Sequence, residues 1–137
     1  MSAARKPAPR PSAESQPFWD AAQKRKLVLQ HCRSCGQCWF PPSARCHHCL
    51  SADFEWRETS GEGRIYSFVV YHRLYHPGFE ADLPYIVAIV ELREGPRLLS
   101  NIIGTRWQDV RCDMAVRATF DDDGRGLLIP KFAIRGG

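Results

Sequence analysis

Two pairs of cysteines constrain the fold of this chain more than any other feature. The stretch from Cys32 to Cys49 reads CRSCGQCWFPPSARCHHC, so Cys32/Cys35 and Cys46/Cys49 are both Cys-x-x-Cys pairs. Four thiolates at such spacing can close a tetrahedron around one metal ion. Because the protein would fill all four positions, none is left for water or substrate. We therefore predict a structural metal rather than a catalytic one, and favour Zn²⁺ over iron.

Three other uses of this stretch need to be considered: two disulfides, a mixed site with Cys38 or the histidines His31, His47 and His48, and a nucleophilic Cys38–His47 pair. Nothing in the sequence indicates secretion, and in a reducing compartment this spacing is more often a metal site. We expect Cys38 to be a small, partly buried residue and the histidines to lie on exposed loops. No acid partner stands at a recognisable spacing for nucleophilic catalysis. The prediction is a rubredoxin-like zinc ribbon without a catalytic residue.

The length and the hydropathy of the chain limit the rest of the fold. With 137 residues, of which 44% are apolar, it can bury one modest core beside a metal-stapled appendage. The longest aliphatic run, residues 86–90, is far too short to span a membrane, and the N-terminus has no apolar signal region. We expect a soluble, cytoplasmic protein. The remaining cysteine, Cys112, falls in an alternating stretch and is expected to be a buried free thiol.

Charge is distributed unevenly along the chain. Residues 1–50 hold eight Lys/Arg against two Asp/Glu, whereas residues 51–137 hold eleven against thirteen. A nucleic-acid-binding barrel would carry its own cationic groove, because phosphate neutralisation supplies most of such affinity. The balance of the second part predicts that nucleic acid is not the partner.

Four segments follow from the patterns along the chain. Residues 1–16 are rich in Pro, Ala and Ser and are expected to form a disordered tail. Residues 17–30 are expected to form a helix from Pro17 to Lys26 and a lead-in strand. Phe18 and Trp19 are the apolar anchors of this helix, and Phe18, Ala22 and Arg25 or Lys26 stand at helical spacing. The ribbon is assigned to residues 31–60 and the barrel to residues 61–137.

The barrel is predicted from period-two alternation. Five stretches rich in Val, Ile, Tyr or Phe are separated by Pro, Gly and Asp clusters: residues 64–75, 85–93, 97–103, 115–121 and 127–133. Five such strands indicate a small closed antiparallel barrel. The loop at residues 76–84 is longer and more apolar than a simple connection requires, and such loops often carry function.

Several short sequence motifs occur in a characteristic order along residues 17–134. They are Phe18-Trp19 and residues 29–36, 40–42, 54–56, 60–63, 65–68, 84–88, 90–92, 101–104 and 130–132. In their order and spacing, the chain resembles the two-domain proteins, long filed as a domain of unknown function, that pair a rubredoxin-like zinc ribbon with an OB-fold and occur beside thiolase-superfamily enzymes acting on acyl-CoA. It departs from that family at residues 46–50, where proline and glycine are usual, and at Asp113, where glycine is usual.

The resemblance implies an all-β fold with a short N-terminal helix, a zinc ribbon and a five-stranded OB-fold barrel. It also implies a non-catalytic accessory subunit in a hetero-oligomer with a thiolase, a thiolase-like aldolase or a hydroxymethylglutaryl-CoA synthase. The partner would supply the nucleophile for C–C bond cleavage, condensation or acyl transfer. This chain would help to hold the acyl-CoA or its pantetheine arm.

Candidate contacts with an acyl-CoA can be named on this basis. Polar groups for the thioester arm are Tyr66, Ser67, Tyr71 and His72, and the anionic nucleotide end would lie near Arg33 and Arg45. An alternative is that His72 and His76 act as general bases in catalysis. We prefer an aromatic docking patch, because aromatic side chains dominate interface energetics; its members are Tyr71, Tyr75, Phe79 and Tyr85.

Two functions from other classes remain open on the sequence. One is a nucleic-acid-binding ribbon and OB-fold, since OB barrels with exposed aromatics stack bases. The other is a stand-alone acyl-CoA hydrolase or transferase that uses His72 or Cys38.

Overall fold

A short helix leads the chain into the cysteine-rich region. The computed structural model describes residues 7–135, and within them helix α1 spans Gln16–Gln23 with Phe18 and Ala22 buried. Of the two predicted anchors, Phe18 lies in the core and Trp19 packs against it, partly buried. The helix ends three residues before the predicted Lys26, because Arg25 adopts a left-handed conformation with φ of 60°. The Lys26 N–H then donates to the Ala21 carbonyl at 3.0 Å, which closes the end of the helix.

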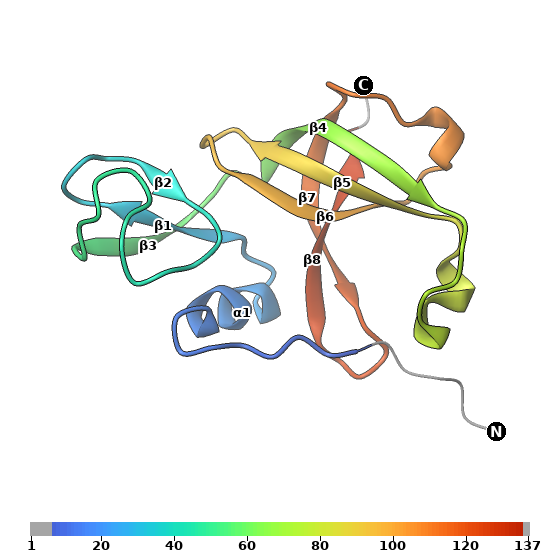
Figure 1. The fold of residues 1–137 in the computed structure, drawn as a ribbon, viewed down its shortest axis with the longest axis horizontal. Coiled ribbons are helices and arrows are strands. Elements are labelled where there is room, and N and C mark those ends of the chain that lie inside the picture. The colour runs from blue at the N-terminus through green and yellow to red at the C-terminus, as the bar shows by residue number, and fades with distance from the viewer. Residues whose placement is uncertain (1–6, 136–137) are drawn as a thin grey trace.

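The cysteine-rich region forms a small sheet of three strands. Strands β1 (Val28–Cys32), β2 (Cys38–Trp39) and β3 (Phe54–Glu58) lie in the order β2-β1-β3, and both pairings are antiparallel. Strand β1 lies where the lead-in strand is predicted. The two-residue strand β2 is too short for any periodicity and was not predicted. Figure 1 shows this sheet at one end of the molecule, beside the barrel.

The second region is a closed five-stranded barrel, as predicted. Its strands are β4 (Glu62–Tyr71), β5 (Tyr85–Leu92), β6 (Arg97–Ile103), β7 (Ala115–Asp122) and β8 (Leu128–Ile134), in the order β4-β5-β6-β8-β7. The expectation of a wholly antiparallel barrel was wrong. Strands β6 and β8 pair in parallel through Ile102 with Phe132 and Ile103 with Ala133.

Alternating burial explains the barrel strands. In β5 every second residue is buried, beginning with Ile86, and the intervening residues are half-buried on the outer side. In β4 the register shifts between Ile65 and Ser67, which leaves Tyr66 on the outer surface. Such a bulge bends a strand and helps a sheet to close.

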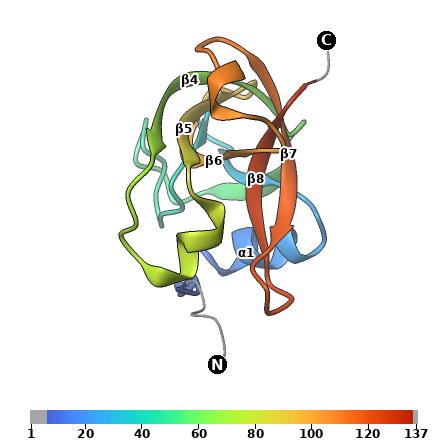
Figure 2. The same ribbon diagram turned by 90° about the vertical axis from the view of Figure 1, so that its right-hand side faces the viewer.

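One apolar core joins the barrel to the segments before the ribbon. Ile65, Val90, Val116 and Phe132 are fully buried at its centre, and Phe18, Leu27 and Leu29 belong to the same cluster. In both ribbon views α1 lies beneath the barrel, near one end of β8 (Figures 1 and 2). Gln23 fixes it there, because its side chain exchanges two hydrogen bonds with the backbone of Leu128.

Two further expectations need correction. The first strand of the barrel ends at Tyr71 rather than residue 75, because Tyr71 pairs with Tyr85, the first residue of β5. Cys112 is exposed rather than buried: it lies in a turn before β7, where Asp113 has φ of 70°.

The long loop between β4 and β5 and the connection between β6 and β7 each hold a short 3₁₀ helix, η1 (Pro77–Asp82) and η2 (Trp107–Asp109), respectively. Residues 1–6 of the predicted tail lie outside the described part of the chain. No helix within residues 7–135 is long and apolar enough to cross a membrane.

Candidate functional site

The structure brings the four cysteines of the two pairs together. All four sulfur atoms lie within 4.8 Å of one another, with Cys32 Sγ 3.5 Å from Cys49 Sγ and Cys35 Sγ 3.6 Å from Cys46 Sγ. A tetrahedron with metal–sulfur bonds of about 2.3 Å would place its sulfurs about 3.8 Å apart. The donor set and its spacing therefore fit a single Zn²⁺ ion.

Two equivalent turns present these sulfurs. In the first, the Gly36 N–H donates to the Cys32 carbonyl at 2.9 Å, and in the second the Leu50 N–H donates to the Cys46 carbonyl at 3.0 Å. Both donors have positive φ, 78° for Gly36 and 66° for Leu50. Glycine adopts this conformation without strain, whereas leucine does not. The second turn is thus the more strained of the two.

Backbone N–H groups point at the sulfurs. The Cys35 N–H donates to Cys32 Sγ at 3.4 Å, and the His48 N–H donates to Cys46 Sγ at 3.3 Å. Burial and contacts with the neighbouring sulfurs raise the pKa of Cys35, to about 12, and the pKa of Cys49. The first of the two N–H bonds instead makes the largest contribution to lowering the pKa of the Cys32 thiol, to about 6. Because the thiolate is the form that binds metal, this hydrogen bond favours a ligand at neutral pH.

A buried glutamine binds the segment that joins the two cysteine pairs. The side chain of Gln30 is 1% exposed, donates to the Ser43 carbonyl at 2.7 Å and accepts from the Ser43 N–H at 2.9 Å. The Trp39 indole donates to the Ser43 hydroxyl at 3.0 Å. These contacts hold that segment against the sheet, and no sequence pattern beyond the residue types indicates them.

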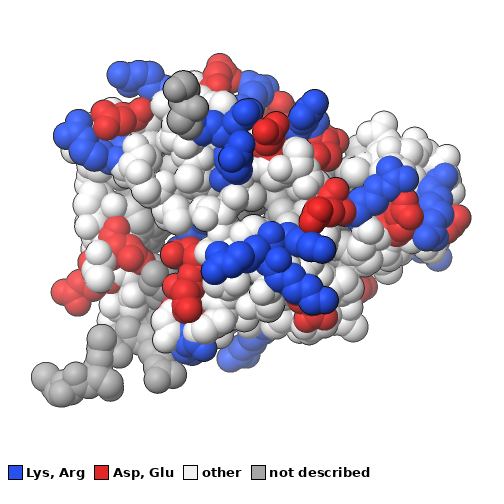
Figure 3. Space-filling view, turned by 180° about the vertical axis from the view of Figure 1, so that it is seen from behind, with Lys and Arg blue, Asp and Glu red and all other residues white. Residues whose placement is uncertain are grey.

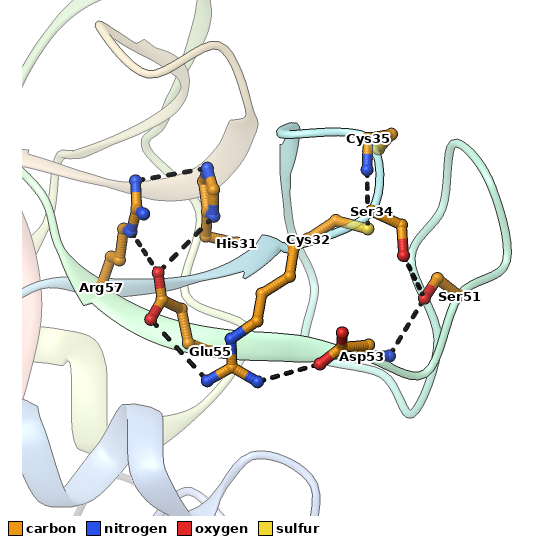
Figure 4. Close-up of polar contacts among 9 residues, drawn as sticks. His31, Cys32, Ser34, Cys35, Ser51, Asp53, Glu55 and Arg57 are labelled. Atoms are coloured by element: carbon orange, nitrogen blue, oxygen red, sulfur yellow. Dashed lines mark hydrogen bonds and ion pairs between the residues drawn. The ribbon is translucent and has the colours of Figure 1, made fainter.

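The predicted acyl-CoA contact Arg33 is engaged within the ribbon. Its guanidinium lies 2.9 Å from Asp53 Oδ1 and 3.8 Å from Glu55 Oε2. Figure 4 shows polar contacts running from Arg57 and His31 to Glu55, on the neighbouring strands β1 and β3. The hydrogen bond from Arg57, together with the charges of Arg57, Arg33 and His31, lowers the pKa of Glu55. Arg33 is therefore part of a balanced network.

The other polar residues of the ribbon also have local roles. Arg45 donates to the Leu50 carbonyl at 3.1 Å and so braces the second turn. His47 and His48 are exposed, as expected, but His31 is half-buried in β1 rather than on a loop. Cys38 is partly buried against the core, as expected. Burial and, to a lesser degree, the charge of Glu94 raise the pKa of the Cys38 thiol, which disfavours a nucleophile.

A groove of about 540 Å³ lies at the opposite end of the barrel from the ribbon. Figure 2 looks onto this end, where η1 and η2 flank the strand ends. Tyr71, Phe79 and Tyr85 form an aromatic wall, with ring centroids 5.1 Å apart for Tyr71–Tyr85 and 5.8 Å apart for Phe79–Tyr85. Burial, and then the neighbouring Tyr71, raises the pKa of Tyr85.

The rest of the groove supplies polar groups that sequence patterns did not reveal. Ser100 and Asn101 on β6 line it, as does an ion pair in which Lys131 Nζ lies 2.9 Å from Asp121 Oδ2. The residues of this pair come from β7 and β8 and meet only through the barrel pairing of Thr119 with Lys131 and Asp121 with Ile129.

The six predicted acyl-CoA contacts do not form one cluster. Only Tyr71 lines the groove; the His72 ring lies 5.3 Å from that of Trp107, another groove residue. Tyr66 and Ser67 flank the bulge of β4, where the Arg97 guanidinium lies 3.8 Å from the centre of the Tyr66 ring. Arg33 and Arg45 lie in the ribbon.

Comparison with known proteins places this architecture in a family. A model described as "ChsH2, rubredoxin-like zinc ribbon domain" matches residues 19–55, and one described as "ChsH2, C-terminal OB-fold domain" matches residues 56–121. A solved structure named "Ltp2-ChsH2(DUF35) aldolase" is similar with a TM-score of 0.84 and 35% sequence identity over 93% of this chain and 98% of that one. The chain belongs to the ChsH2/DUF35 family.

Two curated relatives show the range of proteins in which this ChsH2/DUF35 architecture occurs. A probable enoyl-CoA hydratase alpha subunit of Thermomonospora curvata is 39% identical over 126 residues, which are 90% of this chain and 39% of the relative. This chain thus spans about two fifths of that relative's length. The benzoylsuccinyl-CoA thiolase subunit BbsA of Thauera aromatica is 30% identical over 106 residues, or 74% of this chain and 71% of the relative.

Proposed function

We propose that this chain is a non-catalytic accessory subunit that docks on a thiolase-superfamily enzyme and helps to hold its acyl-CoA substrate. The main support is the match with the Ltp2–ChsH2(DUF35) aldolase structure, which extends over nearly the whole of both chains. The thiolase subunit BbsA supports the same class of partner by its name. Both relatives belong to enzymes of more than one part, and the proposal carries that organisation over to this chain.

The proposal includes a structural Zn²⁺ held by Cys32, Cys35, Cys46 and Cys49. Zinc would join the two turns of the ribbon and contribute folding free energy, since such sites rarely form without their metal. The ribbon core itself is small, because only Cys32, Trp39 and Cys46 are buried in it, with Phe54 packed against them. A segment with so few buried residues depends on the metal for stability.

The docking surface would be the aromatic end of the barrel. Tyr75 is 72% exposed, Leu74 41% and Tyr71 37%, and the Tyr75 ring lies 5.8 Å from that of Tyr71. Contiguous exposed apolar side chains of this kind mark interaction sites. The groove beside them has a volume within the usual range of about 300–1,000 Å³ for small-molecule sites.

The thioester arm would enter this groove past Tyr71 and His72. Its apolar wall would cover the methylene groups, and Ser100 and Asn101 would offer hydrogen bonds to the amides of the arm. Contacts of Tyr66, Ser67, Arg33 and Arg45 with the acyl-CoA stay predictions. For Arg33, Asp53 and Glu55 already balance the charge that would attract a phosphate.

Co-purification from the native cell tests the proposal. The tagged chain is isolated with its companions, which are identified by mass spectrometry, and zinc is measured in the same sample. We expect a thiolase-superfamily protein and about one zinc per chain. Acyl-CoA turnover should require the companion, and the purified chain alone should show none.

Two cysteine variants make the test specific. Cys32→Ser should remove the metal, because it takes away one of the four sulfur donors. It should also weaken binding of the companion, because unfolding of the ribbon would disturb Leu27 and Leu29, which belong to the barrel core. Cys112→Ser should retain metal and companion, since Cys112 is exposed and lies outside the four-sulfur group. Retention of zinc and companion by Cys32→Ser would refute the structural-metal argument. Recovery of the wild-type chain alone, or with nucleic acid, would refute the accessory-subunit proposal.

A further inference from the structure

Five arginines gather on the outer surface of the barrel, away from the groove. Arg64, Arg93, Arg97, Arg117 and Arg135, which we call the arginine face, surround two glutamates, Glu62 on β4 and Glu91 on β5. Strand pairing accounts for the arrangement, because Glu62 is opposite Arg117 on β7 and Glu91 is opposite both Arg64 on β4 and Arg97 on β6.

Three guanidinium groups share the single carboxylate of Glu62. Arg93 lies 3.5 Å from Glu62 Oε2, and Arg135 and Arg117 lie 3.5 Å and 4.0 Å from Oε1. These contacts are long for charge-assisted hydrogen bonds, which are about 2.7–2.9 Å. One carboxylate thus loosely orients three cations and leaves most of their charge uncompensated.

Glu91 is bound more tightly. Arg64 lies 2.9 Å from its Oε1 and Arg97 3.0 Å from its Oε2. The hydrogen bonds from Arg97 and Arg64 hold the pKa of Glu91 below its ordinary value. Arg64 is also paired with Asp113. The five arginines therefore face three carboxylates among the described residues, an excess of two positive charges.

This excess of positive charge is confined to the arginine face. The barrel, residues 61–137, holds ten Lys/Arg and ten Asp/Glu, and without these five arginines and three carboxylates five Lys/Arg and seven Asp/Glu remain. Figure 3 shows Lys and Arg gathered with Asp and Glu along the upper part of the barrel, in the view from behind. The side chains are accessible, at 74% for Arg93, 64% for Arg117 and 43% for Arg135. A positive surface thus stands on an otherwise acidic barrel.

We propose that the arginine face binds a carboxylate-rich surface of a partner protein. This rests on the proposed function in so far as the partner is the companion enzyme. Arginine forks pair with carboxylates in two-point contacts, and Glu62 and Glu91 already orient these forks on the barrel. The face does not suit single-stranded nucleic acid, because Arg97 covers the Tyr66 ring on which a base would stack.

Binding of poly-L-glutamate to the zinc-loaded full chain tests the surface without a partner. The triple variant R93Q R117Q R135Q should bind roughly tenfold or more weakly at low salt, because three exposed ion pairs between the chain and poly-L-glutamate are lost. The matched control R10Q K24Q R25Q removes the same charge from exposed residues outside the arginine face and should bind like the wild type. R93K R117K R135K keeps the charge but loses the two-point contacts, so it should bind more weakly than the wild type and more tightly than R93Q R117Q R135Q.

The outcomes separate this inference from the accessory-subunit proposal. Equal loss in both glutamine variants would show that net charge alone matters and would overturn the inference. Tighter binding of a dT oligonucleotide, or displacement of poly-L-glutamate by free coenzyme A, would overturn it in favour of phosphate. If a companion enzyme is recovered and R93Q R117Q R135Q associates with it at the wild-type rate, the inference fails and the proposed function stands. If no companion is recovered but poly-L-glutamate binding depends on the arginine face, the inference stands and the proposed function fails.

Discussion

Gln30 and Gln23 make the same pair of hydrogen bonds in opposite surroundings, and this yields a quantitative prediction. Each side-chain amide donates to one backbone carbonyl and accepts from the N–H of the same residue, Ser43 for Gln30 and Leu128 for Gln23. Gln30 is buried, whereas Gln23 is exposed. The two sites therefore separate the loss of a hydrogen bond from the cost of leaving a buried polar group unpaired.

Gln30→Leu should destabilise the fold far more than Gln23→Leu. An unpaired buried N–H or C=O costs about 1–3 kcal/mol, and Gln30→Leu leaves one of each on partly buried Ser43. Burial of the apolar leucine offsets part of this, so we expect a net loss of about 2–4 kcal/mol. At Leu128 water can replace the lost partner of Gln23, so that loss should be about 0.5–1.5 kcal/mol.

Urea unfolding of the zinc-loaded protein measures both values. With a slope of about 1–3 kcal/mol per molar, Gln30→Leu should lower the midpoint by roughly 1–2 M and Gln23→Leu by well under 1 M. Zinc release should follow the same order, because Ser43 lies between the two cysteine pairs. Losses that agree within about 0.5 kcal/mol would refute the claim that burial decides the cost.

For four further substitutions the structure predicts the direction of the change in stability. Leu50→Gly should stabilise the ribbon by about 0.5–1 kcal/mol in thermal unfolding, because glycine relieves the left-handed strain and the side chain is 69% exposed; Gly36→Ala is the opposite test. Gly63→Ala should cost roughly 1–3 kcal/mol, since an added Cβ would lie 2.6 Å from the Glu91 carbonyl oxygen. The lowered pKa of Glu91 means that its ion pairs stabilise the fold above the ordinary glutamate pKa, about 4.3, and that this stability is lost as the pH falls through the folded-state value. Glu91→Gln should therefore flatten the acid limb of a stability–pH curve, and an unchanged limb would contradict the assignment.

The ribbon was readable from the sequence because its information is local. Each cysteine pair lies within one turn, so the spacing alone nearly determines where the sulfurs point. The strands of the barrel were equally readable where one face is buried and the other is not, as in β5. The strand that became β4 was predicted to continue to residue 75 because Leu74 and Tyr75 resemble strand residues, although the pairing with β5 ends at Tyr71.

Contacts between residues far apart in the sequence could not be predicted from the sequence patterns. The parallel contact of β6 with β8 joins Ile102 to Phe132 and follows from barrel closure, which alternation does not encode. The same holds for the Asp121–Lys131 pair in the groove and for the arginine face. The predicted use of Arg33 missed its bond to Asp53, twenty residues later in the chain.

The segment between ribbon and barrel shows why the two regions act as one scaffold. Thr59 both donates its N–H to the Leu27 carbonyl at 2.8 Å and bonds the same carbonyl through its hydroxyl at 2.9 Å. The next two residues bond to the barrel, Ser60 N–H to Glu94 at 2.9 Å and the Gly61 carbonyl to the Ala118 N–H at 2.7 Å.

A link whose backbone is bonded on both sides cannot act as a free hinge. Leu27 and Leu29, which lead into the ribbon, also belong to the barrel core. Tilting the ribbon would therefore expose apolar surface as well as break hydrogen bonds. An accessory subunit built in this way would present its aromatic end, its arginine face and its ribbon at fixed distances, so a partner that engages two of these surfaces would meet them without a further loss of conformational entropy.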